Sequence, residues 1–121
     1  MVGYQVEYTD EFETWWVTLT VAQQEDFDAV VRLLEAQGPT LGRPHVDRIQ
    51  GSRLHNLKEL RCDSEGAHLR ALFVFDPRRT AILLLGGDKS GAWQAWYRQA
   101  IPRAEQLYER YLAQLRDEGL M

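Results

Sequence analysis

A carboxylate and several basic side chains are grouped on two segments that alternate in the manner of β-strands. In the stretch NLKELR, Glu59 and Arg61 are two residues apart, so they share one face of a strand, while Lys58 points to the other face. Arg70 belongs to the next such segment, and a hairpin pairing would bring it near Arg61 and Glu59. Lys89 follows a third segment and is placed to close over the same surface. A local excess of cations is suited to a site that meets phosphate.

The same pattern has an ordinary alternative. Charged residues are common on the solvent face of an antiparallel sheet, where Glu59 would form cross-strand ion pairs of small energetic value with Arg61 or Arg70. Such a pair needs one arginine per carboxylate, whereas Glu59 is accompanied here by the basic residues Lys58, Arg61, Arg70 and Lys89. This excess favours a binding site over a set of surface ion pairs.

Other residues that suggest chemistry have structural interpretations. The segment GDKSG lacks the spacing of a nucleotide-binding P-loop, because only Gly86-Gly87-Asp88 precede Lys89. The histidines are scattered along the chain. The tryptophans occur at helical spacing and are expected in the core rather than as stacking platforms for bases. Cys62 is expected to be a small buried apolar residue.

Composition places the chain among small globular domains. The chain has 121 residues, of which 45% are hydrophobic and 11% aromatic, so we expect one domain over residues 1–121 with a real core. It contains no run of about 18 apolar residues, and no membrane span is expected. The N-terminus lacks the basic start and apolar stretch of a secretory signal. A single cysteine excludes an internal disulfide and zinc sites of the CxxC type, and it favours a cytoplasmic location.

Charge is distributed unevenly along the chain. The net charge of −4 taken alone disfavours a nucleic-acid partner. However, residues 1–42 carry eight acidic residues and one basic residue, whereas residues 43–79 carry eight basic and five acidic residues. The remaining residues, 80–121, carry five of each kind. The middle of the chain is therefore locally basic, and local charge matters most for contact with phosphate groups.

Helical periodicity predicts a pair of helices near the N-terminus. After strand-like alternation in residues 4–8, Thr9-Asp10 begins a helix with apolar residues at positions 12, 15, 16 and 19. A second helix begins near Thr20, where Gln23 completes a capping-box pattern, and Gly38-Pro39 ends it. Two short helices with a tight connection form a helical hairpin.

Three strands and a helical C-terminal part complete the predicted fold. Strand-like runs in residues 56–62, 68–76 and 80–85 predict an antiparallel meander after an irregular connection in residues 38–56. The apolar run AILLL indicates that the third strand is central and covered on both faces. Pro102 suits the first turn of a last helix, so two C-terminal helices are expected. We therefore expect an α+β domain whose helical hairpin covers the apolar face of a small antiparallel sheet and leaves the face of Arg70 open.

The sequence also resembles a known protein family. The stretches LGRPHVDRIQGSRLHNLKELR, LRALFVFDPRRTAILLLGGDKSG and WYRQAIPRAEQLYERYL, with the early TDEFETWW, are similar to HigB-type toxins, a phage-related branch of the RelE/ParE superfamily. The similarity covers residues 4–115 and implies a RelE-like fold. For the family's ribonucleases it implies metal-independent cleavage of messenger RNA, usually during translation on the ribosome. The 2′-hydroxyl attacks the adjacent phosphate, so RNA is cut and DNA is not.

The resemblance implies catalytic roles for the grouped side chains. Arg70 matches the family's strand arginine and would hold the scissile phosphate. Glu59 falls where some relatives have a lysine and others a carboxylate, and it would act as the base. Lys89 would stabilise charge or donate a proton. Many relatives carry a tyrosine or histidine in a short C-terminal tail, for which Tyr97 is only a loose match, so the general acid stays open.

The resemblance also implies RNA contacts and partners. Arg61 would make a second contact to phosphate, and Lys58 and Arg53 would contact the RNA backbone. No cofactor and no metal ion is implied. The expected partners are messenger RNA, the ribosome and an antitoxin of the HigA type with a helix-turn-helix domain, received by the acidic helical half, residues 10–37, or by the basic face.

Two other functions are compatible with the same fold. One is a ParE-like toxin that poisons DNA gyrase without cutting RNA, and the other is an inactive phage-derived binding protein. The grouping of Arg61, Arg70 and Lys89 with Glu59 favours RNA chemistry over both.

Overall fold

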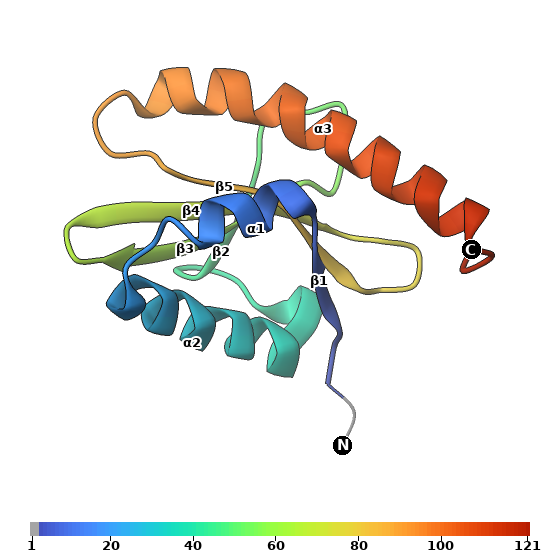
Figure 1. Ribbon diagram of the computed structural model, residues 1–121, viewed down its shortest axis with the longest axis horizontal. Helices are drawn as coiled ribbons and strands as arrows, with labels where there is room; N and C mark the ends of the chain where they lie inside the picture. Colours follow the sequence, from blue (N-terminus) through green and yellow to red (C-terminus); the bar gives the residue numbers. More distant parts are fainter. Residues whose placement is uncertain (1–2) are drawn as a thin grey trace.

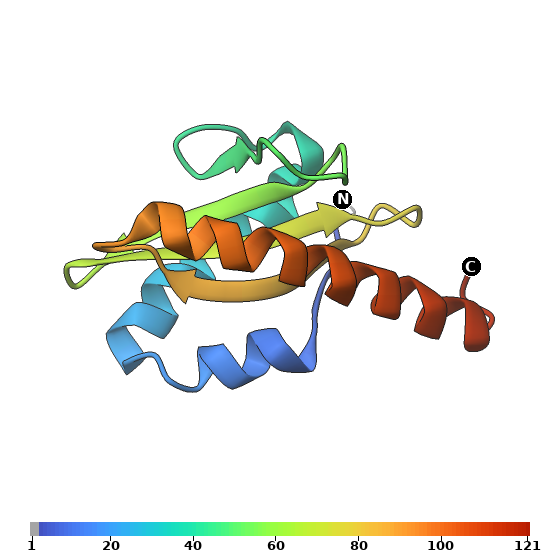
Figure 2. The same cartoon turned by 90° about the horizontal axis from the view of Figure 1, so that it is seen from above.

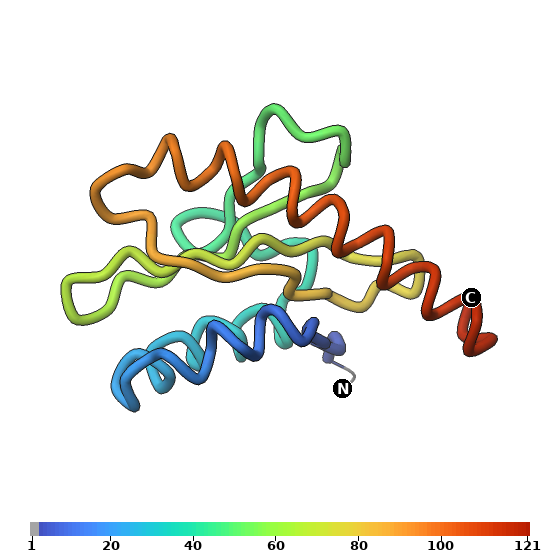
Figure 3. Tube along the Cα trace, turned by 45° about the horizontal axis from the view of Figure 1, so that its top comes forward, coloured from blue at the N-terminus to red at the C-terminus, as the bar shows by residue number. Residues whose placement is uncertain are grey.

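The computed structural model describes residues 3–121 and shows one sheet between two helical layers. Its elements are β1 (Val6–Tyr8), α1 (Asp10–Trp16), α2 (Val21–Gln37), the 3-10 turn η1 (Gly38–Thr40), β2 (Val46–Arg48), β3 (Lys58–Ser64), β4 (Ala67–Phe75), β5 (Ala81–Asp88) and α3 (Trp93–Asp117). The helices α1 and α2 lie on one side of the strands and α3 lies on the other (Figure 1). The same three layers are visible in the Cα trace (Figure 3). The predicted α+β class is confirmed.

The sheet contains five strands in the order β1-β5-β4-β3-β2. The strands β3, β4 and β5 form the predicted antiparallel meander, and β1 joins its end in parallel with β5. The expectation of a wholly irregular connection in residues 38–56 is wrong, because this segment contains η1 and β2. Strand β2 has only three residues, too few for a recognisable alternation, and its pairing with β3 defines it.

Strand β5 is covered on both faces, as its apolar run predicts. Ala81 and Leu83 belong to the core beneath α1 and α2, whereas Ile82 and Leu84 belong to the core beneath α3. All four side chains are at most 3% exposed. Strand β5 is an interior strand of the sheet, because β1 pairs with its outer edge. The middle strand of the five is β4.

Local hydrogen bonds define both helices of the predicted hairpin. The Thr9 hydroxyl accepts a hydrogen bond from the Phe12 backbone N–H at 3.0 Å, which caps α1. Thr20 and Gln23 form the complete capping box of α2, with bonds of 3.1 and 3.0 Å. Gly38 has a φ of 57°, and the Tyr4 ring lies where its Cβ would be, so a glycine is required at this helix end. The sequence prediction of the hairpin is confirmed.

The C-terminal part is one helix, α3, rather than the two helices that were expected. Pro102 lies inside this 25-residue helix. Its ring is on the exposed side of the helix, whereas Ala100, Ala104 and Leu107 pack on the sheet. Proline has no N–H to donate, but water can hydrate the carbonyl that is left without a partner on the exposed side. Seen from above, α3 runs diagonally across the strands (Figure 2). Neither α3 nor any other helix within residues 3–121 is apolar enough over a sufficient length to cross a membrane.

Candidate functional site

Arg61 on β3 and Arg70 on β4 are directly opposite each other in the antiparallel pairing. Glu59 is two residues before Arg61 and therefore lies on the same face of β3. This is the face covered by α3, since the neighbouring Leu57 and Leu72 belong to the core beneath that helix. Like charges at directly opposite positions destabilise a sheet, so this pairing is favoured when an anion lies between or beside the two guanidinium groups.

The two guanidinium groups retain free hydrogen-bond donors. Arg70 Nη1 donates to the Asp63 carboxylate at 3.1 Å and to the Leu69 carbonyl at 2.8 Å. Arg61 Nε is 3.7 Å from the nearest Glu59 carboxylate oxygen. Within residues 3–121, the Nε atoms of both arginines are buried and have no hydrogen-bond partner. A buried N–H without an acceptor is costly, and a phosphate oxygen would supply one.

The expectation that Arg70 points to an open face is wrong. Arg70 is only 4% exposed, because α3 covers this side of the sheet. Both arginines nevertheless line a pocket of about 500 Å³ at the edge of β3, together with Asp26 and His45. The pairing of β2 with β3 stops at Leu60, and the Arg61 backbone N–H still donates to the His45 carbonyl at 2.8 Å, so the edge of β3 without a partner strand begins beyond Arg61. The pocket approaches the two arginines from the edge of the sheet, on the side of α2 rather than through α3.

Tyr97 of α3 connects the covering helix to Glu59. Its hydroxyl donates a hydrogen bond to the Glu59 carboxylate, which is 5% exposed. Burial, and then this hydrogen bond, raise the pKa of Tyr97, so its hydroxyl stays protonated. In the family resemblance, Tyr97 was only a loose match to a tyrosine or histidine of the C-terminal tail. No local pattern links it to Glu59, which is 38 positions away.

Lys89 joins the same group of side chains, as expected. Its Nζ lies 5.7 Å from the centre of the Tyr97 ring and 6.0 Å from that of Trp93. Burial, and then the charge of Arg70, lower the pKa of Lys89, while Glu59 acts in the opposite direction. A lysine with a lowered pKa gives up its proton more readily, which suits a proton donor.

The strand predicted over residues 56–62 ends just before Asp63, but this residue lies within β3 on the face of Glu59 and Arg61. It accepts hydrogen bonds from Arg70 and from His68, whose Nδ1 is 3.0 Å away. The bond to His68, and then that to Arg70, hold the pKa of Asp63 below its usual value. Asp63 thus remains ionised and positions the Arg70 guanidinium. The alternation of β3 would have identified it if the strand had been extended by one residue.

Two predicted RNA contacts lie away from this group. Lys58 is on the opposite face of β3, as its position in the alternation predicts, and its Nζ is 5.6 Å from the centre of the Phe75 ring. Arg53 forms ion pairs with Glu105 and Glu109 of α3. Its guanidinium is therefore occupied by protein carboxylates, and the structure does not bring it to Arg61.

The grouped side chains offer the parts of a phosphate site with proton transfer. Arg61, Arg70 and Lys89 are cationic, Glu59 can accept a proton, and Tyr97 can donate a hydrogen bond. Within residues 3–121, no cluster of three or more His, Cys, Asp or Glu side chains is arranged to hold a metal ion.

The fold is that of RelE-type proteins. The free E. coli toxin RelE, in a doubly substituted form, superposes with a TM-score of 0.60 at 12% identity, over 84% of this chain and 97% of RelE. The archaeal RelE–RelB complex from Pyrococcus horikoshii gives a TM-score of 0.54 at 13% identity, over 73% of this chain and 97% of the other. At such identities the likeness concerns the fold alone, and it confirms the predicted RelE-like architecture.

Sequence comparison then gives the family. Residues 14–109 match the family described as phage derived protein Gp49-like (DUF891). The chain is 48% identical over 103 residues to "Putative toxin HigB3" of Mycobacterium tuberculosis, covering 85% of this chain and 89% of that relative. It is 40% identical over 117 residues to "Putative toxin HigB2" of the same organism, covering 96% of this chain but 58% of that relative. The chain belongs to this Gp49-like, HigB-type family, in agreement with the resemblance found in the sequence.

Proposed function

We propose that this protein is the toxin of a type II toxin–antitoxin pair and a metal-independent endoribonuclease that cleaves messenger RNA. The observation that carries the proposal is the cross-strand pair of Arg61 and Arg70, whose buried Nε atoms have no partner within residues 3–121. A carboxylate, Glu59, and an amine of lowered pKa, Lys89, stand beside them. Family membership with relatives named as toxins supports the biological role.

In the proposed reaction, the two arginines bind the scissile phosphate. Glu59 takes the proton from the 2′-hydroxyl, whose oxygen attacks the phosphorus. The bond to the 5′-oxygen of the next nucleotide breaks, and Lys89 supplies the proton to that oxygen. The products are a 2′,3′-cyclic phosphate and a free 5′-hydroxyl. The cations act on the negative charge that builds up on the phosphate oxygens.

Before Glu59 can take a proton from RNA, Tyr97 of α3 must release the Glu59 carboxylate. The Glu59 carboxylate is engaged by Tyr97 and is 5% exposed. The start of α3 has no side-chain cap, and Trp93 is 51% exposed, so the first residues of the helix are weakly attached. We propose that RNA enters at the β3 edge, binds the arginines and displaces Tyr97 from Glu59.

The proposal includes three macromolecular partners: messenger RNA, the ribosome and an antitoxin. Cleavage would take place on messenger RNA during its translation on the ribosome. A HigA-like antitoxin with a helix-turn-helix domain would neutralise the protein in the cytoplasm. The solved RelE–RelB complex, a structural neighbour, supports an antitoxin partner.

The test compares arginine variants in an RNA cleavage assay, with free and with translated messenger RNA. We expect Arg61→Ala to lower the rate by a factor of about 10²–10³, as for the loss of one donor to a developing negative charge. Arg70→Lys keeps a charge at the buried position but loses the donor geometry, and it should lower the rate similarly. Arg32→Ala is the matched control, because the Arg32 side chain is 75% exposed on α2 and should leave the rate unchanged.

Two outcomes would overturn the proposal. One is cleavage at the wild-type rate in both site variants. The other is no cleavage by the wild-type protein on free or ribosome-bound RNA. A gyrase supercoiling assay would then distinguish a ParE-like toxin from an inactive binding protein.

A further inference from the structure

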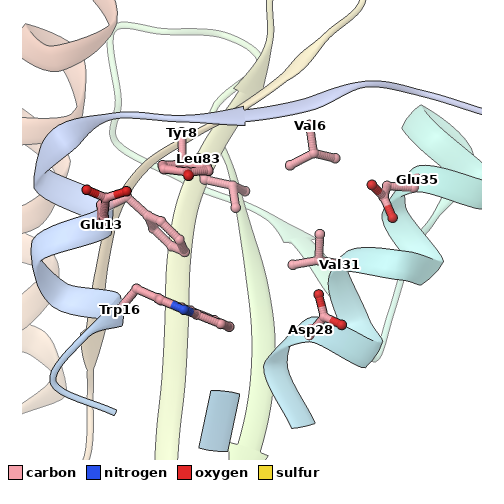
Figure 4. Close-up of a pocket in the computed structure, with 9 residues that line it drawn as sticks. Val6, Tyr8, Glu13, Trp16, Asp28, Val31, Glu35 and Leu83 are labelled. Carbon is pink, nitrogen blue, oxygen red and sulfur yellow. The ribbon is translucent and has the colours of Figure 1, made fainter. Parts of the chain in front are cut away.

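A second pocket lies on the side of the sheet that carries α1 and α2, away from the candidate site. It has a volume of about 270 Å³ and is bordered by β1 as well as by the two helices. Figure 4 shows side chains of β1, α1 and α2 facing one another across it, with Leu83 of β5 behind them. Its apolar lining comes from Val6, Tyr8, Phe12, Trp16, Val31 and Leu83. Tyr8 is 55% exposed, so this apolar surface continues outward from the pocket.

Acidic side chains stand on both sides of this pocket, which we call the hairpin groove. Glu13 lies on α1, and Asp28 and Glu35 lie on α2 (Figure 4). Asp28 pairs with Arg32, whereas Glu13 and Glu35 form no ion pair within residues 3–121. The groove thus has an apolar centre between two carboxylates that form no direct ion pair within the described residues. Phosphate groups would be repelled here, so the groove does not fit RNA.

We propose that the hairpin groove binds a basic amphipathic helix of the antitoxin. Such a helix would insert apolar side chains between α1 and α2 and place lysine or arginine residues against Glu13 and Glu35. It would also bury Tyr8 and complete a three-helix layer on this face of the sheet. The inference rests on the antitoxin partner of the proposed function. The arginine side chains lie on the other face of the sheet. Their pocket also reaches α2, at Asp26, but it shares no lining residue with the groove, so antitoxin binding and RNA cleavage are separable by substitution.

The test measures binding of the antitoxin encoded in the flanking reading frame, by isothermal titration calorimetry with the full-length protein. Val31→Arg fills the groove and brings a charge against the basic face of the helix. We expect its Kd to rise on the order of 30-fold or more, as for the loss of a central apolar anchor. The double variant Glu13→Lys/Glu35→Lys keeps the apolar lining and reverses the acidic rim. Its Kd should rise about tenfold at low salt, with a smaller effect at high salt.

The double variant Asp117→Lys/Glu118→Lys is the matched control. It makes the same change in net charge at exposed positions at the end of α3, and its Kd should equal that of the wild type. RNA cleavage is measured for every variant. Both groove variants should cleave RNA at the wild-type rate and escape inhibition by the antitoxin at concentrations that silence the wild type.

Three results would overturn the inference. Wild-type affinity in both groove variants would mean that the antitoxin docks elsewhere. Loss of cleavage together with loss of binding in both variants would mean that the groove supports the fold. If the flanking protein does not bind the wild type, the inference fails as well, and the cleavage assay still decides the nuclease proposal by itself.

Discussion

The hydroxyl of Tyr97 donates a hydrogen bond to the Glu59 carboxylate and thereby joins the second turn of α3 to β3. Glu59 is 5% exposed, so the phenol supplies a donor to a carboxylate that water hardly reaches. The preceding turn of α3 has no side-chain cap. This contact therefore helps to hold the start of the helix over the candidate site, together with the packing of Trp96 on Gly87.

Removal of the Tyr97 hydroxyl should destabilise the protein. In Tyr97→Phe, the buried Glu59 carboxylate loses its donor, and we expect the free energy of unfolding to fall by about 1–3 kcal/mol. Urea denaturation measures the change. Tyr8→Phe is the control, because the Tyr8 side chain is 55% exposed and its substitution should have little effect. Equal free energies of unfolding of Tyr97→Phe and Tyr8→Phe would show that the hydrogen bond from Tyr97 to Glu59 contributes nothing to stability.

Inorganic phosphate should stabilise the protein through the arginine pair. The free Nε donors of Arg61 and Arg70 gain an acceptor when phosphate binds, so Tm should rise with phosphate concentration. At ten times the Kd, binding contributes about 1.4 kcal/mol. Differential scanning fluorimetry in phosphate, with sodium chloride at equal ionic strength, measures the shift. Arg61→Gln corrects for the general effect of phosphate on folded proteins, and a shift of equal size in this variant would refute the prediction.

Cleavage should decline at alkaline pH because of Lys89. Burial, and then Arg70, lower the pKa of this lysine from 10.5, so its proton is lost at a lower pH than in a free side chain. If the protonated amine donates a proton, the rate falls as the pH rises, with a midpoint below 10.5. Single-turnover rates, corrected for alkaline hydrolysis of RNA, measure this profile.

Lys89→Arg provides the control for this profile. An arginine stays protonated over the whole range, so this decline should disappear even if the rate is low. Tyr97 does not account for the decline, because its pKa is raised above 10.0. If the cleavage rate of Lys89→Arg still fell at alkaline pH as in the wild type, the decline would belong to a group other than Lys89.

A methyl group at Gly87 should disturb the contact between β5 and α3. A Cβ at this position would lie 2.2 Å from Trp96 Nε1, so the first turns of α3 would have to move. We expect Gly87→Ala to lower the free energy of unfolding by about 1–3 kcal/mol, as other overpacked positions do. Gly42→Ala meets no atom within 4 Å and should change stability by less than about 0.5 kcal/mol. Chemical denaturation measures the free energy of unfolding of both variants. An equal change in Gly87→Ala and Gly42→Ala would show that Trp96 does not pack closely on Gly87.

The sequence by itself determined which side chains share a face. Alternation along β3 and β4 placed Glu59, Arg61 and Arg70 together and Lys58 on the other side, and the register agrees. The Thr20 capping box and the apolar run of β5 were equally readable. These features are local, because backbone geometry repeats every two residues in a strand and about every 3.6 in a helix.

Only the tertiary structure decided what covers each face. The alternation of β4 predicted an open face at Arg70, whereas α3 covers this face. This helix continues past Pro102 without a break and brings Tyr97 to Glu59. The same helix takes Arg53 away from the site through Glu105 and Glu109. Periodicity records that a face is apolar but not which distant segment packs on it. That choice depends on the summed packing of the whole chain, which no short stretch of sequence contains.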